Sequence, residues 1–231
     1  MKNREYTVWL YGSYARQDFD KFSDIDIFIA GHPDTNQVLK DLQFENRALS
    51  VSQYDWHEIE IMAGYGSLFL QHLKLEGRPL MINSAGNEYL LSLLSSLCPY
   101  KNVSRDVNAF TMCLKDVEEG IERGSTPIFE LSVIATVLRH SSVLASYIIG
   151  YPKFGRIESF QFVAKSWGFS DDIINRFKRL YQFRQYEDNL ASLPFEPEEN
   201  DVKEWLKIAK QFIFLLTEEA YAYEKRVFTT N

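Results

Sequence analysis

Two aspartates, Asp24 and Asp26, stand on either side of one isoleucine at the start of a short apolar run. The alternation predicts a strand, so both carboxylates project from one face while the isoleucines fill the opposite face against helices. Two carboxylates held that close repel each other unless a cation lies between them, and Mg²⁺ typically binds one or two protein carboxylates together with substrate phosphates and water. The pair is therefore a candidate magnesium site, and the alternative is a solvated strand edge.

A glycine and a serine, Gly12 and Ser13, follow an earlier apolar run and precede residues that would begin a helix. Glycine lets backbone N–H groups approach a phosphate closely, a helix N-terminus favours negative charge, and the Ser13 hydroxyl adds a donor. Arg16, in the predicted helix, is placed to support the same phosphate, and a surface position is its alternative. The turn is a candidate phosphate site, with a plain turn as the alternative for Gly12 and Ser13 taken alone.

Ten residues separate Ser13 from Asp24. The combination of Gly-Ser, this spacer and Asp-hydrophobic-Asp resembles the signature of the DNA polymerase beta-like nucleotidyltransferase superfamily. The resemblance implies that Gly12 and Ser13 bind the triphosphate of a nucleotide, and that Asp24 and Asp26 are catalytic and hold Mg²⁺ as the cofactor. The implied reaction is the in-line transfer of a nucleoside monophosphate from a nucleoside triphosphate to an acceptor hydroxyl, with pyrophosphate leaving.

In that superfamily a third carboxylate normally comes from the next core strand, which the sequence places at Ala48–Tyr54. By strand parity the aspartate face then carries Ser50 and Ser52, neither of which is acidic. Asp55 has the parity of the buried face, yet it reaches the site if the strand ends at Tyr54 and the chain turns. Asp55 is the candidate third catalytic acid. The alternative is a degenerate protein of a regulatory or antitoxin type, which binds a nucleotide without transferring it.

The elements that must position these residues change in character along the chain. The first third alternates predicted strands at Tyr6–Tyr11, Asp24–Ile29, Ala48–Tyr54 and Pro79–Ile82 with predicted helices at Thr35–Phe44 and His57–Glu76. After Asn83 the periodicity predicts helices throughout, at Leu90–Leu97, Val103–Glu122, Ile128–Tyr147, Ile157–Trp167, Asp171–Tyr186 and Val202–Val227. The predicted fold class is α+β: a small mixed β-sheet, nucleotidyltransferase-like domain over residues 1–84, followed by an all-α helical bundle over residues 85–231.

The helical part suggests two further resemblances. Minimal nucleotidyltransferase domains are often followed by a bundle that closes over the acceptor, as in the aminoglycoside nucleotidyltransferases, or by a HEPN-type bundle. Some HEPN-type bundles are RNases that use an arginine followed after four to six residues by a histidine. Arg184 stands in a similar segment, but Asn189 takes the histidine's place and cannot act as a general acid or base at neutral pH. Arg184 is therefore predicted to pair with acidic residues or to line a cleft shared by the two domains.

The composition of the 231 residues excludes several classes of protein. The formal net charge of −7 argues against a large nucleic-acid surface, because such surfaces need clustered Lys and Arg. No signal peptide is recognisable and no apolar stretch approaches the length that spans a bilayer, so a cytoplasmic protein without a membrane partner is expected. Cys98 and Cys113 are too few for a disulfide framework. The expected partners are a nucleoside triphosphate and an unidentified acceptor, which is a small molecule, a protein or RNA, and a homodimer stays open.

Overall fold

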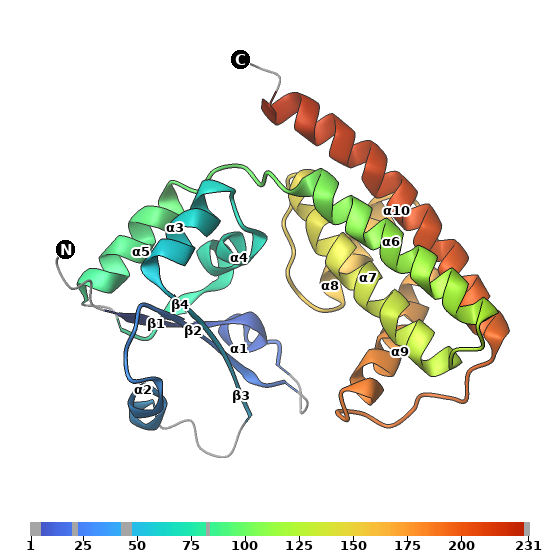
Figure 1. Cartoon of the computed structure of the whole chain (residues 1–231), viewed down its shortest axis with the longest axis horizontal. Coiled ribbons are helices and arrows are strands. Elements are labelled where there is room, and N and C mark those ends of the chain that lie inside the picture. Colours follow the sequence, from blue (N-terminus) through green and yellow to red (C-terminus); the bar gives the residue numbers. More distant parts are fainter. Residues whose placement is uncertain (1–5, 20–22, 43–47, 82–83, 229–231) are drawn as a thin grey trace. The chain divides into compact units, whose positions relative to one another are not determined.

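In the computed structural model the described residues are 6–19, 23–42, 48–81 and 84–228. They fall into two compact units, a first unit over Met1–Lys101 and a helical unit over Asn102–Asn231 (Figure 1). The predicted class, a mixed sheet followed by an all-helical part, is confirmed. The predicted domain boundary near residue 84 precedes this division, so helix α5 (Ala85–Ser95) lies in the first unit.

The first unit is built on a four-stranded sheet in the order β3-β2-β1-β4. β1 pairs antiparallel with β2 and with β4, whereas β2 and β3 run parallel. The two central strands are rich in β-branched and aromatic residues, which suits strands covered on both faces. The strands are β1 (Thr7–Tyr11), β2 (Ile25–Ala30), β3 (Leu49–Tyr54) and β4 (Arg78–Pro79). Ile82, at the end of the predicted last strand, lies outside the described residues.

Helices cover both faces of this sheet (Figure 1). On one face Trp9 and Phe28 pack into a core with Ile59, Leu70 and Leu90 from three different helices. On the other face the isoleucines of β2 pack with Val8 and with Val38. The helices of the unit are α1 (Gly12–Arg16), α2 (Thr35–Asp41), α3 (Trp56–Gly64), α4 (Leu68–Glu76) and α5. Phe44, the predicted end of the second of these helices, lies outside the described residues.

The single helix predicted over His57–Glu76 is wrong, because this segment forms α3 and α4 with a turn between them. Gly66, in the turn, has a φ of 72°, which is the left-handed conformation that ends helices. A Cβ on Gly66 would overlap the backbone of Cys98 and Pro99, so the turn fits against the segment that follows α5. Helical periodicity in the sequence continues across the break and hides it.

The helical unit is organised around α7, which packs against α6, α8, α9 and α10. Phe160, Phe177 and Phe212 are fully buried from three different helices, and the ring centroids of Phe160 and Phe177 lie 3.9 Å apart. This aromatic core belongs to the helical unit alone. The helices are α6 (Val103–Glu122), α7 (Pro127–Ile148), α8 (Glu158–Ser166), α9 (Asp171–Glu187) and α10 (Glu199–Phe228).

Helix α7 is, among the described residues, the one helix long and apolar enough to cross a membrane by length and composition. In its most apolar window 61% of the residues are buried inside the structure. Burial of this kind is what the core helix of a soluble protein shows. The expectation that no apolar stretch approaches the length that spans a bilayer is therefore wrong for α7, while the burial of α7 is consistent with a soluble protein.

The turn at Gly66 generates a prediction about stability. Gly66→Ala is expected to destabilise the first unit by about 2 kcal/mol or more, because a left-handed backbone is unfavourable for alanine and the added Cβ overlaps two backbone groups. Gly64→Ala is the matched control, since nothing lies within 4 Å of a Cβ there and alanine favours the helix. Urea unfolding followed by circular dichroism measures both variants, and equal stability would contradict the role assigned to Gly66.

Candidate functional site

The turn between β1 and α1 lies directly against the start of β2. Tyr11, the last residue of β1, is paired with Asp26. Gly12 follows with a φ of 71°, and a Cβ at this position would overlap the carboxylate of Asp26. Glycine therefore allows both the backbone conformation and the close approach of the turn to the carboxylate.

An anion at this turn would be bound by individual hydrogen-bond donors rather than by a helix dipole. Helix α1 has only five residues, so its dipole is small. The backbone N–H groups at the start of α1 and the hydroxyl of the partly exposed Ser13 are the donors that stand there. The helix dipole therefore contributes less to an anion site than the sequence predicted, and the close approach that Gly12 allows contributes more.

Asp24 and Asp26 flank Ile25, the first residue of β2. Ile25 is buried in the sheet, whereas both aspartates are partly exposed. By strand parity the two carboxylates stand on the face opposite to Ile25, as the sequence predicted. A pair of partly exposed carboxylates therefore lies at the beginning of the strand, beside the Gly12 turn.

Tyr11 is a residue of this site that sequence reasoning did not single out. Its hydroxyl lies 3.0 Å from the Oγ of Ser52. Burial raises the pKa of Tyr11, and the negative charges of Asp26 and Asp24 raise it further, while the hydrogen bond with Ser52 acts in the opposite direction. The phenol therefore stays neutral at physiological pH, at the edge of a negatively charged site.

The face of β3 that adjoins the aspartates carries serines. Asp26 is paired with Ser50, and Phe28 with Ser52, which is the parity that the sequence predicted. The face is not open along its whole length, because Phe28 and Ala30 are fully buried under helices. Only the beginning of β2 is available to a ligand, and no acidic residue of β3 adjoins it.

Asp55, the predicted third acid, lies at the opposite end of the sheet. β2 and β3 are parallel, and Tyr54 is paired with Ala30, four residues beyond Asp26. At about 3.3 Å per residue, the strand separates Asp55 from the pair by roughly 13 Å. The Asp55 carboxylate instead accepts a hydrogen bond of 2.7 Å from the backbone N–H of Glu58 and caps α3. The structure therefore does not bring Asp55 to the aspartate pair.

Arg16 is held by two carboxylates rather than pointing freely at the turn. Its Nε donates to Asp18 over 3.0 Å, and its Nη1 donates to Glu76 on α4. The Nε2 of His72 lies 2.8 Å from the same carboxylate oxygen of Glu76. This cluster connects α1 to α4 through the Arg16 guanidinium, and a contact of Arg16 with phosphate stays a prediction.

The pKa of Glu76 reflects this cluster. Burial alone raises the pKa, but the hydrogen bonds from His72 and Arg16 outweigh burial and hold it below its ordinary value. His72 and Glu76 are four residues apart on one predicted helix, which is a visible sequence signal. Their connection to Arg16, sixty positions away along the chain, gives no local signal.

The helical unit contains the remaining predicted residue, Arg184. Its guanidinium forms an ion pair of 2.8 Å with Asp188 one helical turn later, so the predicted pairing with an acid is present. Its place in a cleft stays a prediction. The HEPN-type resemblance also stays a prediction. Asn189 has a φ of 58° just beyond the end of α9, and its N–H donates to the carbonyl of Tyr186 at 2.9 Å. Asparagine tolerates this left-handed conformation, which explains its presence.

A known protein family matches most of the sheet and the first helices of the first unit. Residues 1–64 match the family model of the nucleotidyltransferase domain, so the match covers 64 of the 231 residues. The matched residues include the Gly12-Ser13 turn, Asp24 and Asp26, whereas Glu76 and His72 lie beyond them. The predicted superfamily resemblance is confirmed for this part of the chain. A search of curated proteins gave no match.

The partly buried cluster around Glu76 predicts a pH-dependent stability. Because the folded-state pKa of Glu76 is lowered, its contribution to folding is present at neutral pH and is lost as pH falls through that lowered pKa. Glu76→Gln should lower the free energy of unfolding by about 2 kcal/mol at pH 7, since hydrogen bonds to a charged group are lost. The difference from the unchanged protein should shrink in acid.

Urea unfolding of the full chain across the acidic range provides the measurement. Asp41→Asn is the control, because Asp41 is an exposed carboxylate on α2 of the same unit and its loss should change stability by no more than about 0.5 kcal/mol. A Glu76→Gln effect that is the same at every pH would show that the ionised carboxylate is not what stabilises the cluster.

Proposed function

We propose that the protein is a Mg²⁺-dependent nucleotidyltransferase that moves a nucleoside monophosphate from a nucleoside triphosphate to an acceptor hydroxyl. The observation that carries the proposal is the approach of the Gly12-Ser13 turn to Asp26, with Asp24 on the same side of β2. A donor-rich turn and two carboxylates at one strand end are what a metal-bound triphosphate requires. The match of residues 1–64 to the nucleotidyltransferase domain supports the same reaction.

The residues of the site fit Mg²⁺ through their chemistry and number. Among the described residues no group of three His, Cys, Asp or Glu side chains is placed to hold a metal. A cage made by the protein alone is not needed, because Mg²⁺ commonly uses one or two carboxylates and completes its shell with phosphate oxygens and water. Asp24 and Asp26 would hold the ion, which when bound neutralises phosphate charge and stabilises the attacking and leaving oxygens.

The chain's own groups bind and orient the nucleotide. The N–H groups of the Gly12-Ser13 turn and the Ser13 hydroxyl donate to phosphate oxygens, and their fixed position favours in-line geometry. The acceptor oxygen then bonds to the α-phosphorus while the bond to pyrophosphate breaks, and the acceptor proton leaves to a base. The neutral Tyr11 hydroxyl, held by Ser52, adds no further negative charge beside the phosphates.

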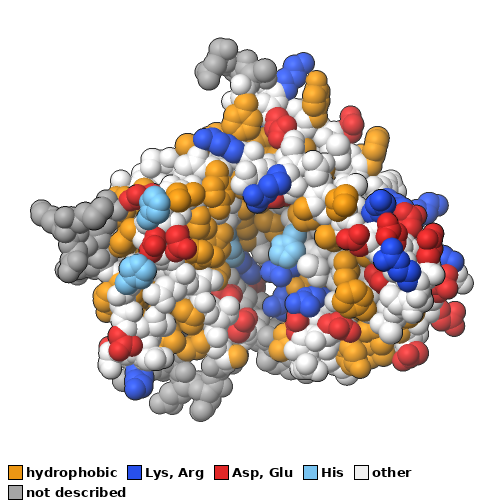
Figure 2. All heavy atoms as spheres, in the orientation of Figure 1, with side chains coloured by type: hydrophobic (Ala, Val, Ile, Leu, Met, Phe, Trp, Pro, Cys, Tyr) orange, Lys and Arg blue, Asp and Glu red, His pale blue; other side chains and the backbone are white. Residues whose placement is uncertain are grey.

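The surface favours a small-molecule or protein acceptor over a long nucleic acid. The chain carries a formal net charge of −7. Over the helical unit, Lys and Arg side chains are interspersed with acidic ones on the face drawn in Figure 2. A phosphate backbone instead selects a continuous basic surface.

The first test of the proposal removes the carboxylate that the glycine turn touches. Asp26→Asn should lower nucleotidyl transfer by about 100-fold or more, because the metal's stabilisation of transition-state charge is worth several kcal/mol. Pyrophosphate release from each of the four nucleoside triphosphates with Mg²⁺ and candidate acceptors measures transfer, and Asp41→Asn is the control. In parallel, a nucleotide with Mg²⁺ should raise the melting temperature of the unchanged protein but not of Asp26→Asn.

Two results would count against this proposal. Transfer that survives in Asp26→Asn at the rate of the Asp41→Asn control would remove the aspartate pair from the mechanism. Nucleotide binding that depends on Mg²⁺ and Asp26, without pyrophosphate release with any acceptor, would instead identify a nucleotide-binding protein that does not catalyse transfer.

A further prediction concerns Asp55, which the structure places far from the pair. Asparagine caps helices about as well as aspartate, so Asp55→Asn should keep both the fold and the rate of transfer within about twofold. Asp55→Ala removes the cap and should cost about 1 kcal/mol of stability while leaving transfer by the folded protein intact. A large loss of transfer in Asp55→Asn without loss of stability would show that Asp55 acts in catalysis after all.

A further inference from the structure

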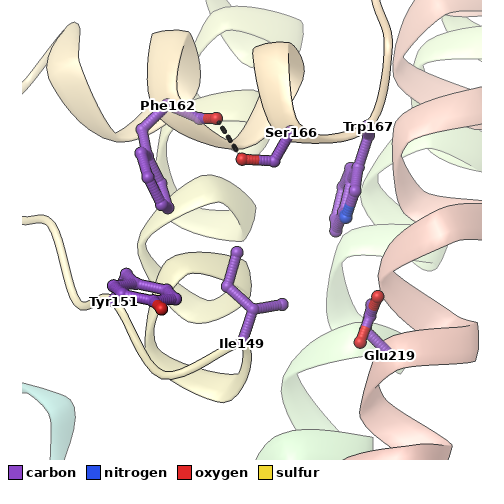
Figure 3. A pocket seen from close by; sticks show the side chains of 6 residues that line it. All are labelled: Ile149, Tyr151, Phe162, Ser166, Trp167 and Glu219. Atoms are coloured by element: carbon purple, nitrogen blue, oxygen red, sulfur yellow. Dashed lines mark hydrogen bonds between the residues drawn. The ribbon is translucent and has the colours of Figure 1, made fainter.

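The helical unit contains a pocket of about 440 Å³ (Figure 3). This volume is in the range of sites for small organic molecules, roughly 300–1,000 Å³. Its walls come from the segment after α7, from α8 and from α10, all within the helical unit. The lining residues are Ile149, Tyr151, Phe162, Ser166, Trp167 and Glu219.

Two helix ends place the aromatic walls of this pocket. Just beyond α7, Gly150 with a φ of 91° turns the chain, and the N–H of Tyr151 donates to the carbonyl of Ser146 at 2.9 Å. Gly168, with a φ of 76°, turns the chain in the same way just beyond α8. These turns hold Tyr151 and Trp167 just beyond the ends of their helices, and Tyr151 is left 67% exposed.

The side chains that line the pocket favour a cation over an anion. Three of its six side chains are aromatic, and the faces of aromatic rings attract cations. Glu219 is the one acidic side chain among the lining residues, and no Lys or Arg is among them. Within the described part of the chain Glu219 has no ion-pair partner, so its charge is not met by the protein there.

The helix ends add little to this preference. The C-terminal ends of α7 and α8 both border the pocket, and the C-terminus of a helix carries partial negative charge. At α7 part of this charge is met by Arg226, which donates to the carbonyl of Ile148 at 2.9 Å. At α8 the last turn carries Lys165, so Glu219 is the main source of negative charge in the pocket.

The pocket is divided into a charged end and an apolar end. Figure 3 shows the Glu219 carboxylate on the same side as Trp167, while the rings of Tyr151 and Phe162 lie on the other side with Ile149 between. The Ser166 hydroxyl donates to the carbonyl of Phe162 at 2.8 Å and is thereby used within α8. A ligand that fills the pocket thus meets negative charge at one end and hydrocarbon at the other.

From this arrangement we infer that the pocket binds a small organic ammonium ion with an apolar body, its nitrogen between Trp167 and Glu219. The ring or chain of the ligand lies over Ile149 against Tyr151 and Phe162. An anion would be repelled by the carboxylate. A neutral apolar molecule would cover Glu219 without compensating its charge, which is unfavourable. The inference concerns the helical unit alone and does not depend on the proposed function.

The experiment compares three ligands of one shape and different charge on the full chain. Phenethylamine is the cation, phenethyl alcohol the neutral analogue and hydrocinnamate the anion. Titrations followed by the NMR signal of the Trp167 indole N–H, assigned with Trp167→Phe, give each affinity. Phenethylamine should bind at least about fivefold more tightly than the alcohol, as an ion pair and a cation–π contact together require. Hydrocinnamate should bind most weakly.

The matched variants are Glu219→Gln and Glu218→Gln, because Glu218 is an exposed carboxylate next to Glu219 that does not line the pocket. Glu219→Gln should reduce the affinity for phenethylamine to that for the alcohol, whereas Glu218→Gln should leave it unchanged. Equal binding of amine and alcohol to the unchanged protein, equal effects of the two variants, or no shift of the Trp167 signal at millimolar amine would each overturn the inference.

Discussion

At the start of α1 the backbone of Gly12 lies against the carboxylate of Asp26, in a space where no Cβ fits. This contact exists because β1 and β2 are antiparallel neighbours with Tyr11 paired to Asp26. The end of one strand and the beginning of the other then meet, and a turn of donors stands beside a pair of acceptors. The rest of the first unit can be understood as holding these two strand ends together.

Helix α1 is too short to be stable by its own backbone hydrogen bonds, so tertiary contacts must hold the turn in place. Arg16 supplies such a contact by joining Asp18 and Glu76. The cluster with His72 is mostly shielded from solvent, so its charges interact more strongly than those of an exposed surface pair. Arg16 thus connects α1 to α4, and its role in phosphate binding stays a prediction.

The helical unit has an aromatic core of its own around α7, separate from the two cores of the sheet. Its loops are shaped by helix ends in the left-handed conformation, at Gly150, Gly168 and Asn189. Residues in the left-handed conformation thus shape both the aromatic pocket and the chain after α9. In the second case this conformation also explains why asparagine stands at position 189, because asparagine tolerates the left-handed conformation.

The sequence by itself determined most of the strands and helices and the candidate pair, because strand alternation and helical periodicity are local and place Asp24 and Asp26 on one face. It also determined, through parity, that Ser50 and Ser52 share that face. The tertiary structure alone decided where strand ends meet. The parallel pairing of β2 and β3 carries Asp55 to the far end, the approach of Cys98 and Pro99 breaks the predicted helix at Gly66, and the packing of α4 brings Glu76 to Arg16. These outcomes depend on contacts between residues far apart in the chain, and local patterns do not record such contacts.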